Sequence, residues 1–335
     1  MLDTILEFLD SIPAGLALAL GMALLLGGGH CLVVGAVHIA RRFGVSTLLI
    51  GLTIVAFGTT APELAFNMVA ASSGNGDLSF GNVVGSNIAN IGLVLGIAAL
   101  VSPLIVSSRV TKRELPLLIV ATLATIGLAF YPEEGFGRTD GLILLAFFLF
   151  CMFQWFRMGR ADRADPLLRE AEAASADGPM GVFPATILFL TGLVALLAGG
   201  KMAELGAVGI ATSLGLSKSL IGLTIVAIAT SLPELVTSVL ASRKGHTDLA
   251  VGNVVGSNLF NLLLVLGASS VFSPQPIPVP NEGVTLGLAS GWWDLGVMML
   301  LTLLLVPFAV TNNRRILRRE GFVLLLIYAG WLGWG

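Results

Sequence analysis

The sequence predicts an all-α polytopic membrane protein, with ten transmembrane helices arranged as two inverted-topology repeats of five helices each. Three observations lead to this prediction. The 335 residues are 56% hydrophobic and only 11% charged, with a mean hydropathy of +0.93. Long apolar runs fill most of the chain, and one apolar segment that contains a few polar residues occurs twice. A soluble domain would have about twice this share of charged residues.

The apolar runs are long enough to cross a bilayer as helices. A transmembrane helix needs roughly 20 mostly apolar residues, whereas a strand of a transmembrane barrel is a segment of about ten residues with alternating polarity. The runs are continuously apolar, so helices are predicted. We expect them near residues 14–40, 46–72, 80–104, 114–131, 139–157, 182–213, 217–242, 249–272, 291–310 and 321–334.

One segment of the first half recurs in the second half. Residues 51–96 align without a gap on residues 222–267, with 26 identical positions of 46 and a constant offset of 171 residues. An offset of half the chain indicates internal duplication rather than a short solenoid repeat. Each half contains five spans, and an odd number places the second copy upside down in the membrane. The predicted division is a first repeat at 1–158, a cytoplasmic linker at 159–181 and a second repeat at 182–335.

The basic residues predict the orientation in the membrane. With both termini outside, the inward loops hold fifteen of the eighteen Lys and Arg residues, as the positive-inside rule requires. The net charge of −2 leaves no basic face for nucleic acid. The lipid bilayer is therefore the expected surrounding partner, and nothing implies an obligatory protein partner.

Two glutamates lie in the middle of the duplicated apolar segments. Glu63 and Glu234 occupy matching positions, each directly after a proline. An ionised carboxylate at this depth costs at least ~2.5–3.5 kcal/mol, so a recurring one indicates function. Pro62 and Pro233 are expected to break or kink their helices just upstream, at 58–61 and 229–232, and to free main-chain carbonyls that are tolerated only beside a polar cavity.

The surrounding polar residues all offer oxygen atoms. In GNVVGSNIAN (81–90) and GNVVGSNLFN (252–261), a serine and an asparagine four residues apart share one helical face. Hard cations such as Na⁺ and Ca²⁺ take oxygen ligands of this kind. The candidate side chains are Thr59, Thr60, Ser86 and Asn90 in the first copy and Thr230, Ser231, Ser257 and Asn261 in the second.

Other chemistries lack their usual residues. No Cys/His cluster suggests a transition metal, and the glycine-rich stretches lack the lysine of a phosphate loop. With three histidines in the chain, no nucleophile–base pair is apparent for a hydrolase. We expect a protein that is not an enzyme and has no cofactor.

The paired motifs resemble a known family. GTTAPEL and ATSLPEL, each followed by GNVVGSN, are similar to the two α-repeats of the cation/calcium exchanger superfamily, and most similar to those of prokaryotic sodium/calcium exchangers. The resemblance covers nearly the whole chain. It implies four clustered ion sites, in which the side chains of Glu63 and Glu234 and the carbonyls of Thr59 and Thr230 bind Ca²⁺.

The same resemblance implies flanking Na⁺ sites. Their ligands would be the carbonyls of Ala56 and Ala227 and the hydroxyls of Thr60, Ser86, Ser231 and Ser257, with Asn90 and Asn261 completing the centre. The chain departs from the family at one position. Many exchangers have aspartate where this sequence has Asn261, so the site holds two carboxylates, and K⁺ cotransport is less expected.

The expected function is a secondary antiporter that exchanges Na⁺ for Ca²⁺ by alternating access. An exchange of three Na⁺ for one Ca²⁺ would be electrogenic. The alternative on the same fold is a proton/calcium or other cation/proton antiporter, because both glutamates can take a proton. A passive channel would need a continuous pore, which the occluding repeat design argues against. By resemblance, the expected location is the inner (plasma) membrane of a prokaryote.

Overall fold

The structure, a computed structural model, confirms an all-α polytopic membrane protein. It describes residues 12–43, 45–130, 135–158, 180–214, 230–280 and 291–334. Eight helices of this described part are long and apolar enough to cross a membrane. Two more, α13 (Leu232–Arg243) and α17 (Arg318–Trp334), lie at the two remaining predicted spans. Nearly all of the predicted linker, and the first half of the 217–242 span, lie outside the described residues.

The spans follow the predicted order. Several of them are composite, because a π-helical turn (η) interrupts the α-helix without ending it. The elements of the first half are α2 (Ala14–Phe43), α3 (Thr47–Ile50), η1 (Gly51–Val55), α4 (Ala56–Ser72), α5 (Gly76–Ala89), η2 (Asn90–Leu95), α6 (Gly96–Val101), β1 (Leu104–Ile105), η3 (Val110–Glu114), α7 (Leu115–Phe130) and α8 (Arg138–Met158). The further elements of the second half are α10 (Val182–Ser213), α14 (Thr247–Leu259), η6 (Phe260–Val265), α15 (Leu266–Phe272), α16 (Gly291–Val310) and β2 (Arg315–Ile316).

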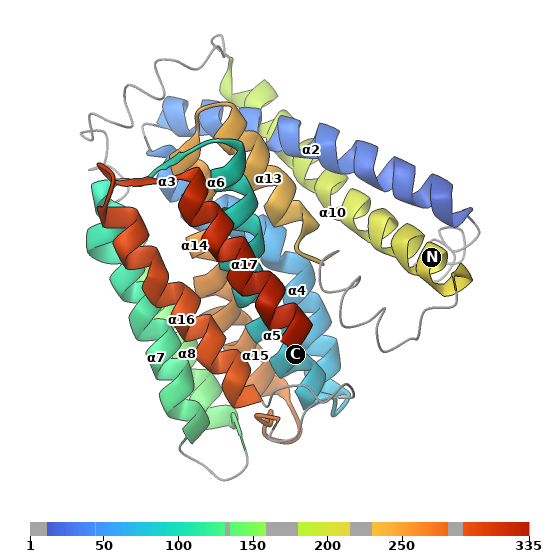
Figure 1. Ribbon diagram of the computed structural model, residues 1–335, viewed down its shortest axis with the longest axis vertical. Helices are drawn as coiled ribbons and strands as arrows, with labels where there is room; N and C mark the ends of the chain where they lie inside the picture. The colour runs from blue at the N-terminus through green and yellow to red at the C-terminus, as the bar shows by residue number, and fades with distance from the viewer. Residues whose placement is uncertain are drawn as a thin grey trace.

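The two GNVVGSN helices form the centre of the bundle. They are the most buried of the candidate spans: 94% of the apolar window of Thr247–Phe272 and 78% of that of Gly76–Val101 are buried. Helices α7, α8, α16 and α17 pack around them, while α2 and α10 form a separate pair at one side (Figure 1). The duplicated polar motifs therefore lie in the interior, away from lipid.

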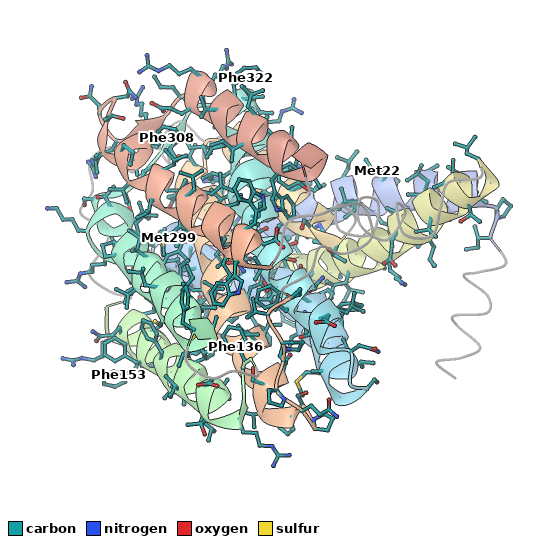
Figure 2. The ribbon with its side chains drawn as sticks, turned by 60° about the horizontal axis from the view of Figure 1, so that its bottom comes forward. Met22, Phe136, Phe153, Met299, Phe308 and Phe322 are labelled. Atoms are coloured by element: carbon teal, nitrogen blue, oxygen red, sulfur yellow. The ribbon has the colours of Figure 1, made fainter. Side chains whose placement is uncertain are left out.

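Helices α2 and α10 pack against each other along almost their whole length. A Cβ added to Gly21 would lie 2.4 Å from the backbone nitrogen of Ala203, and one added to Gly192 would lie 2.4 Å from that of Leu32. Only glycine allows backbones to approach this closely. Both pictures show the pair projecting beside the rest of the bundle (Figure 1, Figure 2).

These glycine contacts are reciprocal. Adding the offset of 171 to Gly21 gives Gly192, and subtracting it from Ala203 gives Leu32, so the two contacts exchange under the sequence duplication. Reciprocal contacts of this type are the mark of a two-fold interface, in which the same patch is used by both copies. They support the predicted duplication, while the exact limits of the two repeats stay a prediction.

The outer surface carries large apolar side chains, as lipid contact requires. Met22, Phe153 and Phe322 are 40%, 58% and 54% exposed and point outward from three different helices (Figure 2). Phe136, by contrast, is fully buried at one end of the bundle. Apolar exposure on this scale is unusual for a soluble monomer and ordinary for a chain embedded in a bilayer.

The prediction that proline unwinds the preceding turn is wrong in the first copy. Helix α4 runs without interruption from Ala56 to Ser72, with Pro62 inside it. Proline removes one backbone donor and so withdraws the bond to the Gly58 carbonyl, but this loss does not require the turn 58–61 to unwind. The irregularity lies one turn earlier, in η1. In the second copy Pro233 stands in the first turn of α13, where its missing N–H costs nothing.

A candidate cation site between two glutamate helices

Two buried carboxylates face each other at the middle of the bundle. Glu63 lies on α4 and is 3% exposed, and Glu234 lies in the first turn of α13 and is 1% exposed. They lie close enough for their charges to interact directly. Glu63 Oε2 and both carboxylate oxygens of Glu234 lack a hydrogen-bond partner in the described part of the protein. Two negative groups held together in this way form a centre for a cation.

Most of the other predicted side chains bring further oxygen atoms without protein partners. Among the described residues, both copies of the repeated segment contain buried side-chain oxygens without a hydrogen-bond partner. They are Thr60 Oγ1, Asn90 Oδ1, Ser231 Oγ, Ser257 Oγ and Asn261 Oδ1. A buried oxygen without a donor costs about 1–3 kcal/mol. Together with the two buried carboxylates, these atoms make this part of the bundle a candidate site for a positive ion.

Ser86 lies near the end of α5 and Asn90 is the first residue of η2, and Ser257 and Asn261 occupy the matching positions on α14 and η6. All four side chains are buried, as the shared helical face predicts. A π-helical turn begins at Asn90 in the first half and at Phe260 in the second. Such turns widen the helix by one residue and occur frequently at functional sites. Sequence reasoning did not foresee them.

The two halves meet at a pair of equivalent asparagines. Asn258 Nδ2 donates to the carbonyl of Asn87 across 3.4 Å, and these two residues are 171 positions apart. A residue that contacts its own counterpart lies on the axis that relates the two copies. The glutamates and the GNVVGSN motifs are therefore gathered around one pseudo-two-fold axis.

Thr59 and Ala56 lie on α4 at the same depth. The Thr59 hydroxyl is fully buried, donates to the Ala56 carbonyl at 3.3 Å or to Asn253 Oδ1 at 3.4 Å, and faces the Glu234 carboxylate. Its contact with Asn253 places Thr59 where the first copy meets the second. Thr230 stands one residue before Ser231 and is partly exposed, and Ala227 lies outside the described residues.

Four other polar residues have ordinary structural surroundings. Lys201 and Glu204 form an ion pair of 2.9 Å on α10, which is partly exposed. Asp77 is exposed in the first turn of α5, whereas its counterpart Asp248 is buried and accepts a hydrogen bond from Thr47. None of these groups belongs to the glutamate centre.

One group of residues near the site was missed. Asn67, Asn82 and Asn253 make side-chain hydrogen bonds directly behind the glutamate helices. The signal was available, because each is an amide in an apolar segment, and Asn82 and Asn253 hold the same place in the repeated GNVVGSN motif.

A helical membrane protein with facing carboxylates and an oxygen-rich interior has the features of a cation transporter. The comparisons with known proteins agree. The family described as "Sodium/calcium exchanger protein" matches residues 14–156 and 184–334, and the chain belongs to this family.

Individual relatives match over almost their whole length. The CaxA protein of Alkalimonas amylolytica is 42% identical over 325 residues, covering 96% of this chain and 98% of the relative. The sodium/calcium exchanger MaX1 of Methanosarcina acetivorans is 32% identical over 348 residues, covering 95% and 97%. Among solved structures, the sodium-calcium exchanger NCX_Mj, soaked with zero Na⁺ and Ca²⁺, is similar with a TM-score of 0.78 and 31% identity, covering 96% of this chain and 98% of that one.

Proposed function

We propose that the protein is a secondary antiporter that exchanges Na⁺ for Ca²⁺ across the membrane. The observation that supports this function best is the cluster of buried oxygen atoms around Glu63 and Glu234 that have no hydrogen-bond partner in the described part of the chain. Apart from Asn261 Nδ2, the unpartnered atoms of these site residues are oxygens, and they sit on two matched motifs. Hard cations are the ligands that such a set selects.

In this proposal, Ca²⁺ binds at the centre. Its ligands are the carboxylates of Glu63 and Glu234 and the main-chain carbonyls of Thr59 and Thr230. The two negative charges balance one Ca²⁺ completely. Moving Ca²⁺ from water into this buried site costs desolvation free energy. Two ionised carboxylates and carbonyl dipoles that are already in place compensate for this cost.

The Na⁺ ions occupy flanking positions in the same oxygen cluster. The proposed ligands are the carbonyls of Ala56 and Ala227 and the hydroxyls of Thr60, Ser86, Ser231 and Ser257, and the amides of Asn90 and Asn261 complete the middle of the site. Because these positions border the same carboxylates, Na⁺ and Ca²⁺ compete for one pair of charges. This competition is the coupling: one kind of ion must leave before the other is carried.

Transport follows from alternating access between two inverted repeats, 1–158 and 182–335. The close backbone packing of α2 against α10 favours their movement as one unit beside the central bundle. An exchange of three Na⁺ for one Ca²⁺ moves one net charge, worth ~2.3 kcal/mol per 100 mV of membrane potential. A negative interior would then assist Ca²⁺ extrusion.

The distribution of Lys and Arg supports an orientation with both termini outside. The inner membrane of a prokaryote is the proposed location. The proposed cycle needs the two ions and the lipid bilayer, and no cofactor or partner protein takes part in it.

Proton coupling is the second candidate. The observation that favours it is the burial of two facing carboxylates, since protonation of either one would relieve their repulsion. On this alternative, protons replace Na⁺ as the competing ion at Glu63 and Glu234.

The driving ion separates the two candidates. Purified protein is reconstituted into liposomes loaded with Na⁺, with K⁺ or with acid, diluted into Na⁺-free buffer, and assayed for ⁴⁵Ca²⁺ uptake with the membrane potential set by valinomycin. Uptake that requires internal Na⁺ and responds to voltage is the expected result. Uptake driven only by the pH gradient would replace Na⁺ coupling by proton coupling, and uptake without any counter-ion would indicate a channel.

A further inference from the structure

The first glutamate helix is held by a buried amide that has no equivalent in the second. Asn67 lies one turn after Glu63 on α4 and is fully buried. Its Nδ2 atom donates to the main-chain carbonyl of Glu63 at 2.7 Å and to Asn82 Oδ1 at 2.7 Å. Its Oδ1 atom accepts from the hydroxyl of Ser79 at 2.9 Å. Both polar ends of this side chain are therefore engaged.

The matching positions of the second copy are occupied differently. Adding 171 to Asn67 and Ser79 gives Ser238 and Ala250, whereas Asn82 becomes Asn253. Asn253 Nδ2 donates to Ser238 Oγ at 3.1 Å. In the described part of the chain, the Ser238 side chain makes no hydrogen bond to the Glu234 carbonyl, and Ala250 offers no hydroxyl. Among the described residues, the Ser238 side chain makes one hydrogen bond where the Asn67 side chain makes three.

We propose that Asn67 is a positioning residue for Glu63, and that it makes the two glutamates unequal: Glu63 is the fixed cation ligand and Glu234 the adjustable one. This inference rests on the proposed function. Pro62 removes one backbone bond from the preceding turn, the bond to the Gly58 carbonyl. The Asn67 amide adds a bond to the next turn, at the Glu63 carbonyl, and ties this turn through Asn82 and Ser79 to the central helix α5.

A ligand that is held in its binding geometry before the ion arrives loses less freedom on binding, and so binds more tightly. Partners that orient the direct ligands of a metal typically contribute about 10- to 100-fold in affinity. The unequal support behind the two glutamates therefore predicts an unequal effect of removing it. An effect on apparent Ca²⁺ affinity is expected for the first copy and not for the second.

The chain provides its own control for this proposal. Asn67→Ala removes all three bonds, Ser79→Ala removes one of them from a neighbouring helix, and Ser238→Ala makes the equivalent change behind Glu234. Na⁺-driven ⁴⁵Ca²⁺ uptake into proteoliposomes is measured over a range of Ca²⁺ concentrations for each variant. We expect Asn67→Ala to raise the KM for Ca²⁺ about ten-fold with little change in kcat, Ser79→Ala to raise it less, and Ser238→Ala to leave it unchanged.

Equal KM values for Asn67→Ala and Ser238→Ala would overturn the proposal. A lower kcat with an unchanged KM in Asn67→Ala would also overturn it, because that result is expected of an amide with a purely structural role. If Asn67→Ala does not fold, the KM of Ser79→Ala is compared with that of Ser238→Ala instead, and equal values overturn the proposal. Wild type and Glu63→Gln are measured alongside. If the wild type shows no Na⁺-driven uptake, the proposed function and this inference are both overturned. If the wild type is active, Glu63→Gln is inactive and Asn67→Ala has an unchanged KM, only the inference is overturned.

Discussion

The contact between α2 and α10 leaves no room for a methyl group. A Cβ at position 192 would lie 2.4 Å from the backbone nitrogen of Leu32, whereas ordinary van der Waals contact begins at 3.4 Å. The obstructing atoms are backbone, so they cannot move aside as a side chain could. In Gly192→Ala the two helices must therefore separate locally by about 1 Å, which for overpacking costs about 1–3 kcal/mol.

The expected result is a lower melting temperature of the purified protein together with slower ⁴⁵Ca²⁺ uptake, because the proposed moving unit loses its internal packing. Gly21→Ala makes the equivalent change on the other helix and should have the same effect, since its Cβ also meets a backbone nitrogen at 2.4 Å. Gly27→Ala is the matched control. Its Cβ meets nothing within 4 Å, so stability and uptake should not fall below wild-type values.

Two results would refute this reasoning. Wild-type behaviour of both Gly192→Ala and Gly21→Ala would mean that the helices do not pack as closely as described. A large effect in only one of the two would contradict the reciprocal, two-fold nature of the contact.

Four further substitutions test other parts of the account. Glu63→Gln and Glu234→Gln should each reduce Na⁺-driven ⁴⁵Ca²⁺ uptake to background while the protein still purifies as a folded species; robust exchange in either variant would remove the glutamates from the site. Asn261→Asp adds a third negative charge to the cluster and should favour Ca²⁺ over Na⁺ in competition assays, so an unchanged ion preference would speak against a position beside the ions. Thr47→Val removes a buried hydrogen bond to Asp248 and should lower the unfolding free energy by about 1–3 kcal/mol, visible as a lower melting temperature and absent if that bond contributes nothing.

The fold, the paired glutamates and the oxygen-bearing side chains of the candidate site could be predicted from the sequence. Hydropathy gave the spans, because each must hide its backbone from lipid in one continuous apolar helix. The two glutamates were also recognisable from the sequence. A charge inside the membrane is costly, so two glutamates at matching positions of the repeated segment indicate function. The four-residue spacing predicted that Asn90 shares a helical face with Ser86 and Asn261 with Ser257, and all four side chains are buried.

What the sequence did not give depends on helix irregularities and on contacts between distant segments. The proline rule predicted an unwound turn before Pro62, but one lost hydrogen bond is compatible with an intact helix when the surrounding helices hold it. The π-helical turns η1, η2 and η6 share no sequence signal, because η1 and η2 contain a glycine and η6 contains neither glycine nor proline. Asn67 looked like any polar residue in an apolar helix until its three partners were brought together by the packing of α4 on α5.

The central claim is that Na⁺ and Ca²⁺ compete for one pair of carboxylates. The most direct test is Ca²⁺ binding to the purified protein, measured by calorimetry at increasing Na⁺ with K⁺ keeping the ionic strength constant. The account predicts that the apparent Kd for Ca²⁺ rises steadily with Na⁺ and that Glu234→Gln abolishes the binding. Ca²⁺ binding that is indifferent to saturating Na⁺ would show that the two ions do not share the site, and would contradict the proposed coupling.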